Sequence, residues 1–166
     1  SSASDVYKRQ VLTLLLINEP LPKYGWRLGD WRFGMLSVVI CLGLIAPLLY
    51  WSSKMPDFVA YYKWRLQIGY WKLFFQYGLY MLSWEFLIRG YIYFSLEERL
   101  GMLAIWLQSV PFAVAHLGKP SAEALTCFFG GLVLGYISMR SRSFLYAFLI
   151  HWGIYSTLLA FIALKH

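Results

Sequence analysis

The chain has 166 residues, of which 60% are hydrophobic, 20% aromatic and only 14% charged. Soluble domains carry about 25% charged residues, so this composition excludes an ordinary water-soluble domain. The formal charge of +7 comes from Lys and Arg residues scattered between apolar runs. Because they form no basic stripe, they argue against a nucleic-acid partner and favour contact with anionic membrane lipid.

The beginning of the chain differs from the rest of the sequence. Residues 1–10, SSASDVYKRQ, are polar and without pattern, and we expect them to be a non-native leader. The apolar run Val11–Ile17 is shorter than the roughly 20 residues that a helix needs to cross a bilayer. We therefore predict one transmembrane domain over residues 11–166, a fragment whose first span is truncated.

Five longer apolar runs come next, and each is predicted to be a membrane span. Their ranges are 34–51, 73–96, 101–117, 122–139 and 143–164. Between the first two, Asp57–Lys72 mixes basic and aromatic residues, which is typical of a segment lying along the membrane interface. The predicted fold is all-α, a polytopic transmembrane helix bundle with about five complete spans plus the truncated one. Lys and Arg divide evenly between the two sides, so they do not orient the bundle.

Two features concern helix packing. Pro111 interrupts the span 101–117 and is expected to bend it. Gly131 and Gly135 are four residues apart, a spacing of small residues that lets two membrane helices approach closely. Cys41 and Cys127 have no Cys or His at ligand spacing, so neither a disulfide framework nor a zinc ribbon is indicated.

Ionisable residues within apolar runs require a partner or a purpose, because a charge inside the bilayer is costly. Glu85 and Arg89 are four residues apart on one helix face and can neutralise each other. His116 and His151 lie in two other apolar runs, and Glu123 begins a third. Taken singly, these five could be a structural ion pair, packing histidines and an acid favoured by a helix N-terminus.

Considered jointly, the buried ionisable residues favour chemistry. A carboxylate and imidazoles around water are what hydrolysis by an activated water requires. We predict that Glu85, His116 and His151 converge within about 10 Å. The chain has neither a His-Glu-x-x-His nor a Gly-x-Ser-x-Gly motif. Water is therefore the expected nucleophile. The histidines and carboxylates could bind a divalent metal, but no compact spacing requires one, so the cofactor remains open.

Three segments together resemble a known family. Residues 84–90 (WEFLIRG), Phe112-x-x-x-His116 and His151-x-x-x-Tyr155 resemble, in order and spacing, the three motifs of the CPBP intramembrane proteases. That family includes the prenyl-protein (CAAX) endopeptidases and the bacteriocin-processing Abi proteins. The resemblance covers about residues 24–160.

The resemblance implies an intramembrane endopeptidase that hydrolyses a peptide bond of a membrane-associated or lipid-modified protein. It implies that Glu85 and His116 activate water and that Arg89 holds Glu85. His151, with the Tyr155 hydroxyl, would donate to the oxyanion. It also implies a multi-pass protein of a bacterial cytoplasmic membrane.

Two positions depart from the family pattern. Trp84 stands where the family has the first of two glutamates, and Tyr155 stands where it has Asn or Asp. Three alternatives arise: Glu85 has become the base, Glu123 supplies the missing carboxylate, or catalysis has been lost. The last alternative would make the chain a non-catalytic relative that binds a peptide or lipidated partner. A transporter or channel fragment is disfavoured, because ionisable residues occur on few spans and no pair of interrupted helices recurs.

Overall fold

The computed structural model describes residues 20–165, and the regular structure in this range is entirely helical. The predicted all-α class is therefore confirmed. In chain order the elements are η1 Leu21–Tyr24, α2 Trp31–Ser52, α3 Pro56–Tyr62, η2 Lys63–Ile68, α4 Tyr70–Glu85, η3 Phe86–Tyr93, α5 Phe94–Leu100, α6 Leu103–Val114, α7 Ser121–Ser141 and α8 Leu145–Ala163. The run Val11–Ile17 and the leader at residues 1–10 lie outside the described residues.

Three described helices are long and apolar enough to cross a membrane: α2, α7 and α8. They correspond to the predicted spans 34–51, 122–139 and 143–164. The predicted span 73–96 is a run of three consecutive helical elements, α4, η3 and α5, and the span 101–117 contains the shorter helix α6. Helix α2 has many exposed large apolar side chains, including Val39 and Leu44. This outward surface suits a lipid environment.

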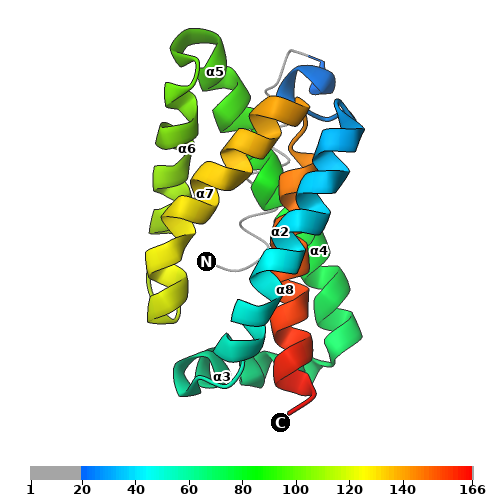
Figure 1. Cartoon of the computed structure of the whole chain (residues 1–166), viewed down its shortest axis with the longest axis vertical. Helices are drawn as coiled ribbons and strands as arrows, with labels where there is room; N and C mark the ends of the chain where they lie inside the picture. The colour runs from blue at the N-terminus through cyan, green and yellow to red at the C-terminus, as the bar shows by residue number, and fades with distance from the viewer. Residues whose placement is uncertain (1–19, 166) are drawn as a thin grey trace.

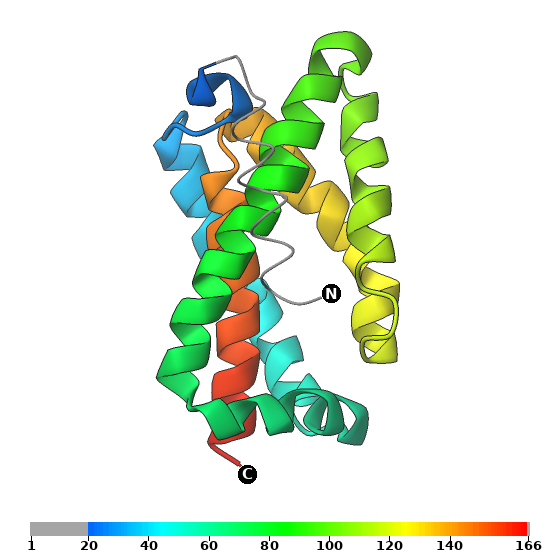
Figure 2. The same cartoon turned by 180° about the vertical axis from the view of Figure 1, so that it is seen from behind.

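Helix α8 packs between α2 and α4, whereas α6 and α7 pair with each other along the other side (Figures 1 and 2). The second half of α8 has a continuous buried face, on which Leu159 and Ile162 are almost fully enclosed. Along α7, every third or fourth position is buried against its neighbours. This arrangement places the middle of α8 beside the end of α4, where the first candidate site residues lie.

The segment Asp57–Lys72, predicted to lie along the interface, forms α3, η2 and the first turn of α4. In Figure 1, α3 lies across the lower end of the bundle, near the C-terminus. Pro56 occupies the first turn of α3, where its missing N–H costs no hydrogen bond. The helix buries Phe58 and Tyr62 and so attaches the crosswise segment to the bundle.

The close approach predicted for Gly131 and Gly135 is present between α6 and α7. A Cβ atom at Gly135 would lie 2.5 Å from the side-chain nitrogen of Gln108, and one at Gly131 would lie 3.1 Å from Ser109. Because these two glycines have no side chains, Gln108 Nε2 can approach α7 and donate to the Gly131 carbonyl at 2.9 Å. A polar hydrogen bond between helices therefore accompanies the small-residue contact.

Candidate active site

Glu85 and Arg89 form a fully buried ion pair at the junction of α4 and η3. Arg89 Nη1 lies 3.0 Å from Glu85 Oε1 and 2.9 Å from Oε2, and neither side chain is exposed. The guanidinium also lies 4.0 Å from the centre of the Phe112 ring, whose face attracts a cation. The helix is of the π type from Phe86 to Tyr93, a wider form that is frequent at functional sites.

His151, from the middle of α8, completes a buried triad with this pair. Its Nδ1 lies 2.6 Å from Glu85 Oε1, although the two residues are 66 positions apart in the chain. An ionised carboxylate only accepts hydrogen bonds, so Nδ1–H of His151 donates. This bond fixes the ring orientation and leaves Nε2 as the nitrogen available for other chemistry.

His116 lies in the turn that follows α6, and its tautomer is fixed by the backbone. Its Nδ1 lies 2.7 Å from the carbonyl oxygen of Phe112. Because a carbonyl can only accept, Nδ1 must carry the hydrogen, and Nε2 of the neutral ring therefore has a free lone pair. The ring stacks beside that of His151, with their centres 6.1 Å apart.

Glu123, in the first turn of α7, provides a second carboxylate beside His116. Its Oε1 lies 3.9 Å from His116 Nε2 and 2.7 Å from Lys119 Nζ. Its other oxygen, Oε2, accepts a hydrogen bond of 2.5 Å from the Tyr62 hydroxyl. The side chain is 22% exposed, whereas that of Glu85 is completely enclosed. Glu123 is therefore the carboxylate of the two that water can reach.

Tyr62 comes from α3 and was not among the residues predicted from the sequence. Burial and the adjacent Glu123 carboxylate raise the pKa of its hydroxyl well above the ordinary value, so the group remains a protonated donor. A contact across 61 residues leaves no signal in a sequence pattern. Lys119 was also missed, although it lies four residues before Glu123 and such spacing could have suggested an ion pair.

The two departures from the family pattern have different surroundings. Trp84 is half-buried, with its ring stacked on Tyr80 at a centre distance of 6.4 Å. Tyr155 is buried, with its ring stacked on Tyr77 at 4.0 Å and packed edge-on against Tyr62 at 6.0 Å. Its hydroxyl makes no hydrogen bond within residues 20–165.

The predicted site residues thus fall into two linked groups. Glu85, Arg89 and His151 form one, and His116 with Glu123 forms the other. The stacked histidine rings join the groups, so Glu85, His116 and His151 do lie together. Tyr155 belongs to a separate tyrosine cluster, formed by the rings of Tyr62, Tyr77 and Tyr155.

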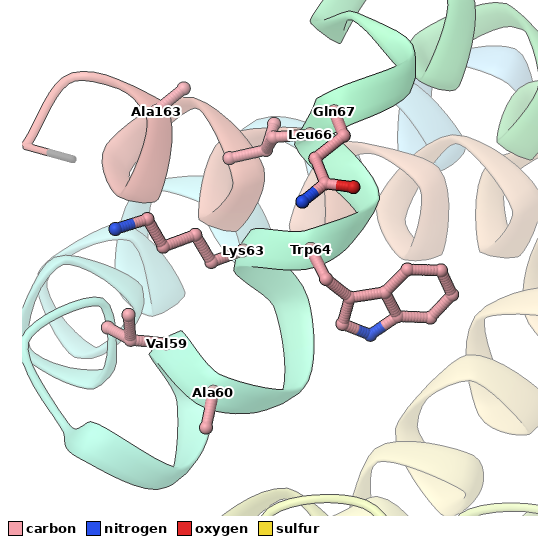
Figure 3. A pocket seen from close by; sticks show the side chains of 7 residues that line it. All are labelled: Val59, Ala60, Lys63, Trp64, Leu66, Gln67 and Ala163. Atoms are coloured by element: carbon pink, nitrogen blue, oxygen red, sulfur yellow. The ribbon is translucent and has the colours of Figure 1, made fainter.

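Two further features of the described residues bear on these groups: a groove and the grouping of metal-ligating side chains. A groove of about 530 Å³ lies at one end of the bundle, and residues of α3, η2 and the end of α8 line it (Figure 3). Its walls include Lys63, Trp64 and Ala163, and no candidate site residue. Within residues 20–165, no three His, Cys, Asp or Glu side chains are grouped as a metal would require.

Comparison with known proteins identifies the family. Residues 66–157 match the sequence model of the family described as type II CAAX prenyl endopeptidase Rce1-like. The chain belongs to this family. The matched range includes all six predicted site residues: Glu85, Arg89, His116, Glu123, His151 and Tyr155. No curated protein and no solved structure gives a significant match.

Membership of this family of CAAX endopeptidases confirms the resemblance inferred from the three motifs. The family is one of proteases. Together with the three helices that are apolar and long enough to cross a membrane, the match shows that the chain is an integral membrane protein. Tyr62 precedes the matched range by four residues. The structure therefore brings a residue from outside the family match into contact with one inside it.

Proposed function

We propose that this chain is an intramembrane endopeptidase that hydrolyses a peptide bond of a membrane-associated, lipid-modified protein. The observation that carries the proposal is the arrangement of His116 Nε2 and Glu123 Oε1, 3.9 Å apart. Both atoms are acceptors, and the distance is too long for a direct hydrogen bond. One water molecule can donate one hydrogen to each of them.

In the proposed reaction, this water attacks the carbonyl carbon of the scissile peptide. His116 Nε2 takes one proton from the water as the new C–O bond forms, and Glu123 stabilises the resulting imidazolium. When the tetrahedral intermediate collapses, the C–N bond breaks and His116 returns the proton to the leaving amine. The Phe112 carbonyl holds the ring in the required tautomer throughout.

Glu85 has a supporting role in this proposal. Its carboxylate is fully enclosed and is held by Arg89 and His151, so it has no side open to water. A protonated His151 keeps its Nδ1–H on Glu85 and has Nε2–H free to donate to the oxyanion. Of the three alternatives left open by Trp84, we therefore favour the one in which Glu123 supplies the missing carboxylate.

We also propose that the bundle crosses the membrane five times in the described range. The run of α4, η3 and α5 covers residues 70–100, about 46 Å at the rise of an α-helix, which exceeds the roughly 30 Å hydrocarbon core. Helix α6 is shorter than the other spans, and it would cross the hydrocarbon core together with the turns at its two ends. Cysteine accessibility at Gly101 and Gly118 would test this crossing, because the two positions should react from opposite sides.

Cleavage of a defined peptide tests the proposed reaction. The substrate is an internally quenched peptide ending in a farnesylated cysteine, two aliphatic residues and methionine, the form that CAAX enzymes process. The purified chain in lipid nanodiscs should cleave it after the cysteine. Glu123→Gln and His116→Gln should each lower kcat at least a hundredfold. The matched control Glu98→Gln alters an exposed carboxylate paired with Lys23 and should leave kcat unchanged. Unchanged cleavage in both site variants would rule out the assignment.

A second function is favoured by Trp84, which puts an aromatic ring where the family has a glutamate. In that case the chain is a non-catalytic relative that binds a peptide or lipidated partner. The same peptide separates the two functions. Saturable binding of the farnesylated peptide without any cleavage product would support the non-catalytic relative.

A further inference from the structure

The Glu123 carboxylate is held by two donors, one on each of its oxygens. Tyr62 donates to Oε2 from α3, and Lys119 donates to Oε1 from the turn before α7. The last torsion of a glutamate side chain is broad and has no strong preferred value of its own. The direction in which Oε1 faces is therefore decided by these two donors.

The two donors differ in how firmly they are placed. Lys119 ends a flexible chain of four methylenes, and its side chain is 21% exposed. Tyr62 is 2% exposed, and its ring is enclosed by Phe58, Tyr61 and Tyr155. The guanidinium of Arg65 lies 5.2 Å from the centre of the same ring. A packed aromatic ring has little freedom, so Tyr62 is the more rigid of the two supports.

We propose that Tyr62 is the positioning residue of the candidate active site, holding Glu123 so that Oε1 faces His116 Nε2. This inference rests on the proposed function. It assigns a task to the crosswise helix α3, which carries a hydroxyl into the site from outside the range matched by the family. It also gives Tyr155 a task, because its ring contacts that of Tyr62.

Tyr62→Phe is the direct test, because it removes the hydroxyl and keeps the ring. With the farnesylated peptide, kcat should fall about tenfold to a hundredfold, the cost of a small misplacement of a reacting group. KM should stay within twofold of the wild-type value, since Tyr62 does not contact the substrate in this scheme. The matched control is Tyr70→Phe, which removes a tyrosine hydroxyl that donates to the Ser156 carbonyl at 3.3 Å. It should leave kcat within twofold.

A second pair of variants separates positioning from general damage to the fold. Glu123→Asp shortens the side chain beyond the reach of Tyr62 and retains a carboxylate. We expect it to lower kcat about tenfold by itself. Adding Tyr62→Phe to it should then cost less than twofold, because the hydrogen bond is already lost. Thermal midpoints of all variants, measured in the same nanodiscs, identify any that misfold.

The outcomes are distinct. Full kcat in Tyr62→Phe, or a tenfold loss that persists in the Glu123→Asp background, would overturn the positioning role while leaving the proposed function intact. A wild-type chain that cleaves nothing would overturn the proposed function, and the positioning role with it.

Discussion

Removal of the Arg89 guanidinium is the perturbation whose consequence the structure defines best. In Arg89→Met, the side chain keeps much of its volume beside Phe112 but loses its charge. Glu85 is then left fully enclosed with His151 as its remaining partner, and its Oε2 has no hydrogen bond. Stability should fall because a buried charge has lost its counter-charge.

The expected size follows from the complete burial of both partners. Breaking a buried ion pair by removing one member costs about 3–5 kcal/mol. In a chain of 166 residues, this corresponds to a thermal midpoint lower by about 10 °C. Glu85→Gln should cost a similar amount, because it leaves the guanidinium as the uncompensated charge. The double variant Glu85→Gln/Arg89→Met buries no charge, so it should recover most of the loss.

The assay is thermal unfolding in detergent micelles, followed by the fluorescence of the chain's eight tryptophans. Glu98→Gln, in an exposed pair with Lys23, serves as the control and should cost less than about 1 kcal/mol. A double variant whose loss equals the sum of the two single losses would refute the reasoning. Such additivity would mean that the two charges do not compensate each other in the folded bundle.

Three further predictions concern packing, the tyrosine cluster and metal dependence. Gly135→Ala should lower the free energy of unfolding by about 1–3 kcal/mol, because the added Cβ would meet Gln108 and Ile105. The control Gly130→Ala has open space around it and should leave stability unchanged. Equal unfolding midpoints for the two variants would contradict the close contact at Gly135. Tyr155→Phe should lose less than threefold in kcat and Tyr155→Ala about tenfold, because the ring of Tyr155 supports that of Tyr62. A loss in Tyr155→Phe as large as that in Tyr155→Ala would instead assign the hydroxyl to the oxyanion. Peptide cleavage should persist through a chelator titration, since no three His, Cys, Asp or Glu side chains within residues 20–165 are grouped as a catalytic zinc site requires. Loss of activity that zinc restores would contradict the last expectation.

Much of the fold could be predicted because membrane helices are marked by long apolar runs. The ranges 34–51, 122–139 and 143–164 agree closely with α2, α7 and α8, since each is bounded by polar residues. The region around Glu85 is different. A single apolar run there contains three helical elements. Their division could not be predicted, because the change from α to π geometry at Phe86 does not alter the hydropathy of the sequence.

The candidate site could be predicted only in part. Glu85 and Arg89 share a helix face by their spacing, so their contact followed from the sequence. That Glu85 and His151 lie close together was predicted from their occurrence in separate apolar runs. Their direct hydrogen bond was not predicted, since nothing local connects residues 66 positions apart. The pairing of His116 with Glu123 was one of the alternatives left open. The turn at Gly118–Pro120 separates the two residues, so helix spacing does not predict whether their side chains share a face. The contact of Tyr62 with Glu123 could not be predicted, because the composition of the segment Asp57–Lys72 indicates only a position at the membrane interface.

The environments of the two carboxylates bear on what Trp84 means for the chemistry. A carboxylate next to Glu85 would add a negative charge beside an ion pair, Glu85–Arg89, that is already fully enclosed. The indole of Trp84 instead packs against the apolar cluster that contains Phe112, the residue whose carbonyl orients His116. Glu123 approaches the same histidine from α7, at a position partly open to water and paired with a cation. The loss of a glutamate from the first motif is therefore compatible with hydrolysis, provided that α3 holds the replacement carboxylate in place.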